Sequence, residues 1–380
     1  MIRARISTIL LSVCLATVAW GQQSASVPLN NWSEFTRDNM RRWNSYENVL
    51  GVDNVPGLQL KWSYTTGDLV YSSPAVVNGV AYAGSYDGNL YAWDATSGAK
   101  LWNFTTEGGI YASPAVANGV VYFNSSTLIY AVNVSDGSLL WSYPMVTESY
   151  GTPTVANGVV YCGDYTGRLY ALNSTTGAHV WTFNSGTQIA SAPAVVNGVV
   201  YVGSENNKVY ALKAATGKII WSFTTGSQVQ SSPAVSGGIV YVGSDDDKFY
   251  ALNATTGAKK WIYTTGAGIP SSPAFANGIV YVGSYDGYVY AFKAGTGALV
   301  WKYLTAGNIV SSPALANNVL YITTETITTG TLYALNASTG TLLWSYPISS
   351  SVGGASPAVA NGMVYFGTGA DYSVYAFGLN

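Results

Sequence analysis

The stretch Ala251-Leu-Asn-Ala-Thr-Thr-Gly-Ala-Lys-Lys-Trp261 recurs, with small variations, in seven places along this chain of 380 residues. Each copy ends in a tryptophan and an eighth tryptophan comes before the first copy, so these rings follow one another at intervals of 39 to 43 residues. The eight are Trp62, Trp102, Trp141, Trp181, Trp221, Trp261, Trp301 and Trp344. Eight prolines keep the same interval: Pro74, Pro114, Pro153, Pro193, Pro233, Pro273, Pro313 and Pro357. A strand-rich repeat near forty residues is typical of a β-propeller, with one four-stranded blade per repeat.

One unit, from Gln228 to Thr265, shows why each repeat is read as four strands. β-Branched and aromatic residues fill four short runs, and glycine- or aspartate-rich turns separate them. The expected strands are 228–235, 239–244, 249–253 and 260–264. The glycine of the Thr-Gly turn supplies a positive φ, and Ala251 leaves space beside it. We therefore expect Trp261 to be buried against that space and the neighbouring blade.

The two ends of the repeat array predict how the ring closes. The last unit has three strand-like runs, at 356–359, 363–367 and 373–377, and no fourth. A matching fourth run stands at 58–65, before the first complete unit. Pairing the two would remove both exposed sheet edges. The sequence thus predicts an all-β, eight-bladed propeller of four-stranded antiparallel blades over residues 58–380, closed by its N-terminal strand.

Residues 1–21 have the pattern of a signal peptide. Arg3 and Arg5 precede an apolar run from Ile6 to Ala19, and small residues follow at the expected cleavage site. The run is short for a transmembrane helix, although an uncleaved anchor is the alternative. We therefore expect an exported protein without a membrane span, located in the periplasm or outside the cell.

Residues 22–57 lie outside the repeat. Aromatic and apolar residues alternate there with arginines, which predicts a short amphipathic segment. The apolar members are Trp32, Phe35, Met40 and Trp43, and the arginines are Arg37, Arg41 and Arg42. The favoured interpretation is a strap packed across the propeller, and a partner-binding arm is the alternative.

Composition excludes several functions. Charged residues make up 9% of the chain and the formal net charge is −2, with no basic stripe, so nucleic-acid binding is not expected. His179 is the only histidine and stands at a position that varies freely among repeats, so neither a histidine-dependent hydrolase nor a histidine-rich zinc site is expected. Asp245, Asp246 and Asp247 occupy a hairpin, where aspartate favours turns, and a calcium site there is the alternative. We predict no catalytic residue and no metal ligand.

The repeated phrase Ala-x-(Asp/Asn)-x-x-(Thr/Ser)-Gly-x-x-x-Trp resembles the tryptophan-docking motif of pyrroloquinoline-quinone-type repeats, and the resemblance covers residues 58–380. Two branches of that family imply different functions. The quinoprotein alcohol and glucose dehydrogenases would imply an oxidoreductase that holds quinone and calcium. The propeller subunit of the outer-membrane β-barrel assembly machinery would imply a non-catalytic scaffold. This chain has near-minimal repeats and no adjacent cysteines, and no calcium-ligand set or catalytic aspartate of the dehydrogenases maps onto it.

Comparison of the repeats with one another identifies a candidate site. The residues three and five positions before each repeated proline vary, whereas the residue between them is mostly Val or Ile. Because side chains alternate along an extended strand, the variable residues should share one side and line one entrance of the channel. The candidate ligand-binding residues are Tyr71, Tyr111, Glu148, Tyr150, Gln188, Gln228, Gln230 and Asn308. Tyrosine faces and amides suit sugars, peptides or a flat ring, and the alternative is that these side chains merely plug the channel.

The favoured function is an exported, non-catalytic binding or scaffolding module of the cell envelope. We expect a monomer that binds a protein partner or a small ligand at the channel mouth, without a cofactor. The first alternative is a quinone-dependent oxidoreductase of the alcohol or sugar dehydrogenase type, in which Glu148 helps to ligate Ca²⁺. The second alternative is a carbohydrate-binding surface protein.

Overall fold

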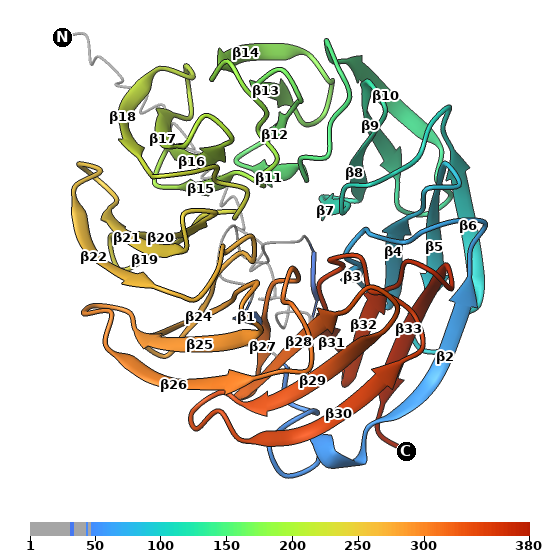
Figure 1. Ribbon diagram of the computed structural model, residues 1–380. Coiled ribbons are helices and arrows are strands. Elements are labelled where there is room, and N and C mark those ends of the chain that lie inside the picture. Colours follow the sequence, from blue (N-terminus) through green and yellow to red (C-terminus); the bar gives the residue numbers. More distant parts are fainter. Residues whose placement is uncertain (1–30, 34–42, 45–46) are drawn as a thin grey trace, which may run out of the picture.

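The structure is a computed structural model that describes residues 31–33, 43–44 and 47–380, and its strands form eight sheets arranged as a ring (Figure 1). Seven sheets contain four consecutive strands in antiparallel order, one of them with a short additional strand beside its innermost strand, and the eighth combines strands from both ends of the repeat array. The predicted eight-bladed, all-β propeller is confirmed. Residues 1–21, the expected signal peptide, lie outside the described residues, and the boundary between strap and propeller stays a prediction.

The seven sheets of consecutive strands are β3 (Ala75–Val77), β4 (Val80–Gly84), β5 (Asn89–Asp94) and β6 (Lys100–Thr105); β7 (Ala115–Ala117), β8 (Val120–Ser125), β9 (Leu128–Asn133) and β10 (Leu139–Pro144); β11 (Thr154–Ala156), β12 (Val159–Gly163), β13 (Arg168–Asn173) and β14 (His179–Asn184); β15 (Ala194–Val196), β16 (Val199–Ser204), β17 (Lys208–Lys213) and β18 (Ile219–Thr224); β19 (Ala234–Ser236), β20 (Ile239–Ser244), β21 (Lys248–Asn253) and β22 (Lys259–Thr264); β23 (Ala274–Ala276), β24 (Ile279–Gly283), β25 (Tyr288–Lys293) and β26 (Leu299–Leu304); and β27 (Ala314–Ala316), β28 (Val319–Glu325), β29 (Gly330–Asn336) and β30 (Leu342–Ile348). The eighth sheet contains β31 (Ala358–Ala360), β32 (Met363–Gly367), β33 (Ser373–Gly378) and β2 (Gln59–Thr65). Two short elements complete the described chain, β1 (Trp43–Asn44) and the 3₁₀ helix η2 (Val55–Gly57).

The eighth sheet closes the ring. Strand β2 pairs antiparallel with β33, and Trp62 lies opposite Ala376. The same register, with a tryptophan opposite a small alanine, joins the third and fourth strands of the other sheets, as between Ala251 and Trp261. First and last segments of the propeller therefore share one sheet, as the sequence predicts, and β33 is paired on both sides, with β32 and β2.

The first strand of each sheet lies nearest the ring axis, and it is shorter than predicted (Figure 1). The prediction of a strand over 228–235 is wrong, because β19 begins at Ala234 and residues 228–233 form an extended loop. Pro233 has no N–H group to donate to a neighbouring strand. The preceding Ser232 instead donates its N–H to the Ser272 hydroxyl of the next blade, 2.9 Å away. The loop is thus held by its neighbours around the ring rather than by its own sheet.

A belt of such bonds runs around the axis at the residue before each proline. In seven of the eight steps, the backbone N–H donates to the side-chain hydroxyl at the equivalent position of the next blade. The bonds are Ser73 to Ser113, Ser113 to Thr152, Ala192 to Ser232, Ser232 to Ser272, Ser272 to Ser312, Ser312 to Ser356 and Ser356 to Ser73, at 2.8 to 3.3 Å. The belt is interrupted once, because Ala192 has no hydroxyl to accept a bond from the blade before it.

The tryptophans connect adjacent blades near the outer edge of the ring. The indole of Trp221 lies on Gly257, where an added Cβ would stand 2.7 Å from the ring, and its Nε1 donates to the Ala254 carbonyl at 2.9 Å. Equivalent bonds join Trp62 to Ala95, Trp102 to Val134, Trp141 to Ser174, Trp181 to Ala214, Trp261 to Ala294 and Trp301 to Ala337. Each ring therefore rests on the Thr-Gly turn of the following unit. Trp344 differs: its ring packs against Tyr346 and Phe377.

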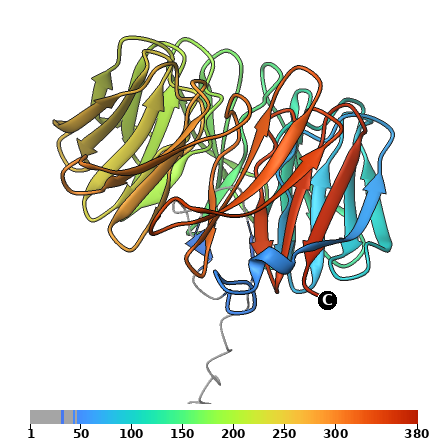
Figure 2. The same cartoon turned by 60° about the horizontal axis from the view of Figure 1, so that its bottom comes forward.

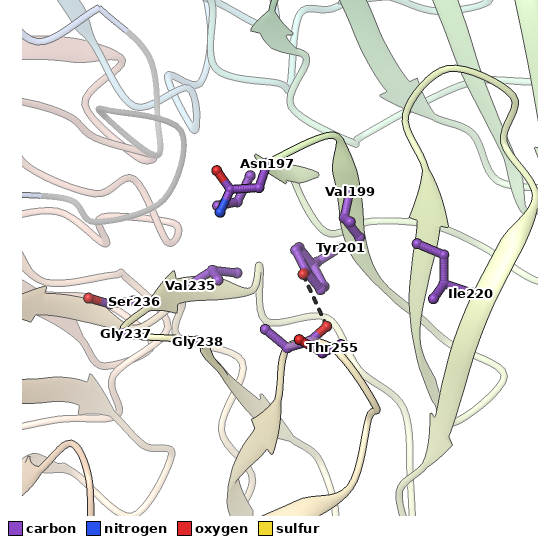
Figure 3. A pocket seen from close by; sticks show the side chains of 11 residues that line it. Asn197, Val199, Tyr201, Ile220, Val235, Ser236, Gly237, Gly238 and Thr255 are labelled. Atoms are coloured by element: carbon purple, nitrogen blue, oxygen red, sulfur yellow. Dashed lines mark hydrogen bonds between the residues drawn. The ribbon is translucent and has the colours of Figure 1, made fainter.

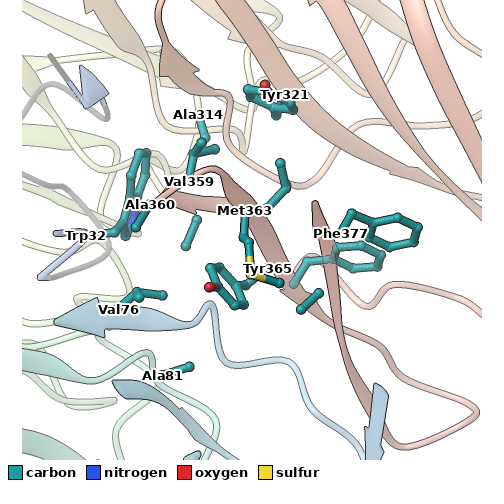
Figure 4. Packing of buried hydrophobic residues seen from close by; sticks show 14 of the residues in the cluster. Trp32, Val76, Ala81, Ala314, Tyr321, Val359, Ala360, Met363, Tyr365 and Phe377 are labelled. Atoms are coloured by element: carbon teal, nitrogen blue, oxygen red, sulfur yellow. The ribbon is translucent and has the colours of Figure 1, made fainter. Parts of the chain in front are cut away.

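Part of the N-terminal segment lies against the inner strands. Trp32 is fully buried, and its backbone exchanges two hydrogen bonds of 2.6 Å with Val76 (Figure 4). Strand β1 pairs in parallel with β27, whose blade lies two places around the ring from that of β3. The side view shows η2 and the C-terminus at one end of the propeller (Figure 2). The described parts of this segment thus occupy the end of the ring opposite to the hairpins between second and third strands.

Candidate binding site at the channel mouth

The loops before the first strands and the hairpins between second and third strands lie at one end of the ring, which we call the mouth. The expected alternation is present in these loops: Val70 and Ile110 are 1% and 0% exposed, whereas the flanking Tyr71 and Tyr111 are half-buried. Ring centroids are 5.2 Å apart for Tyr71 and Tyr111 and 4.3 Å apart for Tyr111 and Tyr150. Three tyrosines that are far apart in the sequence therefore form one continuous aromatic surface.

Two further tyrosines extend this surface, and the sequence reasoning missed both. Tyr86 and Tyr165 belong to hairpins, and their rings lie 4.7 Å from Tyr111 and 5.0 Å from Tyr150, in edge-to-face orientation. The Tyr86 N–H donates to the Leu69 carbonyl at 2.8 Å, which ties the hairpin to the loop. The five rings, Tyr71, Tyr86, Tyr111, Tyr150 and Tyr165, form what we call the tyrosine arc.

A cleft of about 200 Å³ opens within the arc. Tyr86, Tyr111 and Tyr150 line it together with Glu148, which is exposed. Small residues from the same loops complete the lining: Gly108, Gly109, Ser126 and Ser149. The arc therefore does not close completely on itself, and aromatic faces and one carboxylate border an open space.

The opposite side of the mouth is acidic. Glu205, Asp245 and Glu325 occupy the hairpin position that Tyr86 and Tyr165 hold elsewhere. The Gln230 side chain donates to Glu205 Oε1 at 3.1 Å. Burial, followed by repulsion from Glu205, raises the pKa of Asp245, and burial raises the pKa of Glu325. Asp245 and Glu325 therefore have too few hydrogen-bonding or positively charged partners to offset the loss of hydration on burial.

The remaining predicted residues lie on this acidic side. Gln188 and Gln228 accept backbone hydrogen bonds from Glu205 and Asp245 through their carbonyls, both 3.0 Å long, so their side chains are not held by that contact. Gln228 is exposed and Gln188 half-buried. Asn308 exchanges two backbone bonds of 3.0 Å with Glu325 and borders a separate hollow of about 480 Å³. The eight predicted side chains thus surround one mouth without converging on a single point.

No basic side chain of the described residues belongs to the mouth loops. Every described lysine and arginine lies in a third strand, a fourth strand or the turn between them. Lys248, the first residue of β21, forms an ion pair with Asp246 of the preceding hairpin, and its Nζ lies 3.4 Å from Asp246 Oδ2. The negative potential of Glu148, Glu205 and Asp245 is therefore left without a nearby positive partner from the same loops.

In the eighth unit, the predicted mouth position is shifted by one residue. Val352, five residues before Pro357, is 1% exposed and packs against Gly330, where an added Cβ would stand 2.3 Å from it. Val352 therefore takes the buried place that Val70 has in the first unit, and its assignment to the mouth is wrong. The cause is the longer unit between Pro313 and Pro357, which also carries Gly353 and Gly354 at positive φ.

The aspartates at the next hairpin position, such as Asp87 and Asp286, are part of the scaffold, as their turn positions predict. Asp87 Oδ2 accepts hydrogen bonds from the Gly67 N–H and the Tyr91 hydroxyl, each 2.7 Å long. Asp286 has the same two kinds of partner, Gly266 and Tyr290. Each carboxylate thus joins a hairpin to the preceding loop and to the third strand, and these hydrogen bonds hold it in the scaffold.

The single histidine and the buried cysteine have structural surroundings as well. His179 is exposed, bonds to Thr182 at 2.8 Å and stacks on Tyr143. Cys162 is fully buried, and burial raises the pKa of its thiol to about 12, which keeps it protonated and unreactive at neutral pH. No group of three Asp, Glu, His or Cys side chains among the described residues could hold a metal ion.

A further cavity, of about 530 Å³, lies at the other end of the propeller between the sheets of β15–β18 and β19–β22 (Figure 3). Its lining is mainly apolar, with Val196, Ile220 and Val235, and the Tyr201 hydroxyl donates to the Ala254 carbonyl at its edge. This cavity was not predicted from the sequence. The only local sign is Gly237-Gly238, where most units have Asn-Gly.

Comparison with known proteins gives one family match. The family model described as outer membrane protein assembly factor BamB matches residues 43–128, 124–190, 165–284, 263–329 and 286–379. No curated protein matches the sequence. The described residues contain no helix long and apolar enough to cross a membrane.

Several solved structures have the same fold. BamB from Moraxella catarrhalis is 18% identical, with a TM-score of 0.73, over 85% of this chain and 100% of that chain. The computationally designed Ika8 protein is 18% identical, with a TM-score of 0.75, over 84% and 100%. A europium-containing methanol dehydrogenase is 16% identical, with a TM-score of 0.78, over 92% and 98%. At these identities the likeness shows the fold alone, because one propeller serves unrelated functions.

The mouth does not fit the quinone and calcium that dehydrogenases of this fold would imply. Calcium takes six or more oxygen ligands gathered around one point. Glu148, the calcium ligand under the oxidoreductase alternative, is exposed at the rim, and the described residues gather no second and third carboxylate beside it. Pyrroloquinoline quinone is itself a polyanion, whereas the mouth loops contribute Glu205 and Asp245 and no lysine or arginine. The negative charge of the mouth disfavours the quinone, and the small number of neighbouring carboxylates disfavours calcium.

Proposed function

Because the chain belongs to the pyrroloquinoline-quinone-like repeat family whose model is described as outer membrane protein assembly factor BamB, we propose that it is a non-catalytic binding module of the cell envelope. Its partner is a protein, held at the mouth. The pattern of residues 1–21 supports export to the periplasm or beyond. The module acts as a monomer, because the first and last segments of one chain close the ring without a second copy.

The observation that carries this proposal is the tyrosine arc beside an open cleft. Three sets of repeated residues belong to the scaffold: tryptophans join blades, serines form the belt, and aspartates such as Asp87 hold hairpins to loops. The mouth residues differ from blade to blade, and the rings of Tyr111 and Tyr150 remain partly exposed. Rigid aromatic side chains on a fixed frame are the residues that most often dominate protein interfaces.

The proposal is tested by photo-crosslinking in living cells. A benzophenone amino acid replaces the exposed Gln228 in the mouth, and a control replaces the exposed Thr216, in a turn at the other end. We expect one discrete protein adduct from position 228, identified by mass spectrometry, and none from position 216. The same amino acid also replaces Asn308, a second exposed residue of the mouth. Absence of a protein adduct from both position 228 and position 308 would contradict the proposal. Adducts limited to glycans would favour a carbohydrate-binding protein.

The oxidoreductase alternative has its own test. Purified protein is incubated with pyrroloquinoline quinone and Ca²⁺, desalted, and examined for quinone absorbance and dye-linked alcohol oxidation. The acidic mouth predicts that neither is retained. Stoichiometric quinone together with alcohol oxidation would overturn the non-catalytic function, whatever the crosslinking shows.

A further inference from the structure

The cleft in the tyrosine arc has the features of a site for a positively charged group. Ring faces carry negative electrostatic potential, and several aromatic rings around one space are the usual cage for an ammonium or guanidinium group. Tyr86 and Tyr111 meet edge to face at 78°, so their faces point in different directions around the cleft. Glu148 stands at the same cleft and supplies a full negative charge.

The electrostatics of the rest of the mouth favour the same kind of ligand. Burial, followed by repulsion from the charge of Glu205, raises the pKa of Asp245, so these two carboxylates repel each other across the mouth. Asp245 Oδ1 is buried and has no hydrogen-bond partner within the described residues. A cation in the mouth would reduce the repulsion between these carboxylates, whereas a neutral ligand would leave it unchanged and an anion would add to it.

The two sides of the mouth also suggest the shape of the ligand. The tyrosine arc belongs to the first three blades, and the carboxylates of Glu205, Asp245 and Glu325 follow on later blades around the same opening. A single small cation would occupy only the cleft. An extended chain with basic side chains could place one of them on the arc and the next opposite the carboxylates, with the amides of Gln188 and Gln228 available to its backbone.

We propose that the mouth binds a basic, extended peptide segment of the partner protein, with a lysine or arginine side chain lying between Tyr86, Tyr111 and Tyr150. The positive charge of that side chain faces Glu148, and the following residues cross toward Glu205 and Asp245. This inference rests on the proposed function, because it uses the same site and names the chemistry that the site recognises.

The test is calorimetric titration of the full chain with a blocked heptapeptide, Gly-Lys-Gly-Lys-Gly-Lys-Gly. Its matched control carries acetyl-lysine at the three positions, which keeps the length of each side chain and removes the charge. We expect the lysine peptide to bind at least about ten-fold more tightly, with affinity that falls as salt is added. Equal affinity for the two peptides would overturn the proposal, as would tighter binding of spermidine than of the lysine peptide.

Four variants separate a specific cage from a general attraction to an acidic surface. Tyr111→Leu removes one ring and should weaken the lysine peptide about five-fold, whereas Tyr111→Phe keeps an aromatic face and should bind nearly normally. Glu148→Gln should weaken binding and flatten its salt dependence. Tyr143→Leu alters a half-buried tyrosine of a nearby sheet outside the mouth and should leave binding unchanged. Unchanged affinity in both Tyr111→Leu and Glu148→Gln would refute the cage.

Thermal unfolding of the same variants distinguishes binding residues from a channel plug. If Tyr111 only fills the channel, Tyr111→Leu will lower the unfolding temperature strongly, and that result would contradict the proposal. The two proposals fail differently. Crosslinks from Gln228 together with no preference for the lysine peptide would remove the cation site and leave the protein-binding function in place.

Discussion

The contact between Trp221 and Gly257 allows a direct test of how the blades are held together. Gly257 has φ of +73°, and an added Cβ would lie 2.7 Å from two atoms of the indole ring. Gly238, in the same blade, also has φ of +73°, but an added Cβ there would meet nothing within 4 Å. Gly238→Ala is therefore a matched control, with the same backbone strain and no contact with a tryptophan.

The expected losses follow from these two geometries. An alanine in the left-handed region costs about 1–2 kcal/mol, and both variants share this cost. Gly257→Ala must also displace the indole of Trp221, which is 8% exposed, and overpacking of this kind adds about 1–3 kcal/mol. We therefore expect Gly238→Ala to lose about 1–2 kcal/mol of unfolding free energy and Gly257→Ala about 2–5 kcal/mol.

The measurement is urea unfolding followed by tryptophan fluorescence, with equal slopes for the three proteins. Combining Gly257→Ala with Trp221→Leu provides a second check, because removal of the ring should abolish most of the extra cost. Equal stability of the two glycine variants, to within about 0.5 kcal/mol, would refute the docking of tryptophan on the turn as a source of stability.

Three further outcomes can be checked by urea unfolding. Ser73→Ala removes the hydroxyl that accepts the Ser356 N–H in the belt and should cost about 1–3 kcal/mol, whereas an unchanged midpoint would mean that water replaces it without loss. Trp32→Ala empties a fully buried site and should cost about 3–5 kcal/mol, and a loss below 1 kcal/mol would show that Trp32 does not help to hold the inner strands. Burial raises the pKa of Glu325 above its ordinary value of 4.5, so in the window between the two values the native state binds more protons and wild-type stability falls as pH rises. Glu325→Gln should therefore be more stable than wild type at pH 7, with the difference disappearing below pH 4.5, and a constant difference would contradict this assignment.

The blade count, the shared eighth sheet and the contacts of seven of the eight tryptophans were predictable from the sequence, because they follow from residues repeated at a fixed interval. Equal spacing of the motifs predicts equal blades. The pairing of β2 with β33 follows because the last unit lacks a fourth strand and an extra strand stands before the first unit. The first strands were predicted too long. Their extension over 228–233 rests on side-chain alternation, but alternation also occurs in a loop that is held by the hydroxyl belt.

The site was predicted in part. Tyr71, Tyr111 and Tyr150 do form one surface, because equivalent positions of successive blades must be neighbours in a closed ring. Tyr86 and Tyr165 were missed because they lie in hairpins, where variation is ordinarily read as turn chemistry. Comparing the hairpin position across the units, from tyrosine to glutamate and aspartate, would have revealed them. The cavity beside Tyr201 depends on packing between blades, which no local pattern reports.

The most direct measurement of the central claim is fluorine NMR of the protein labelled with 3-fluorotyrosine. Substitution of Tyr111, Tyr150 and Tyr143 by phenylalanine assigns their signals one at a time. Addition of the lysine peptide should shift the signals of Tyr111 and Tyr150 and leave that of Tyr143 in place, and the acetyl-lysine peptide should shift none of them. Shifts confined to tyrosines outside the arc, or the same shifts with both peptides, would show that the mouth does not recognise a basic partner.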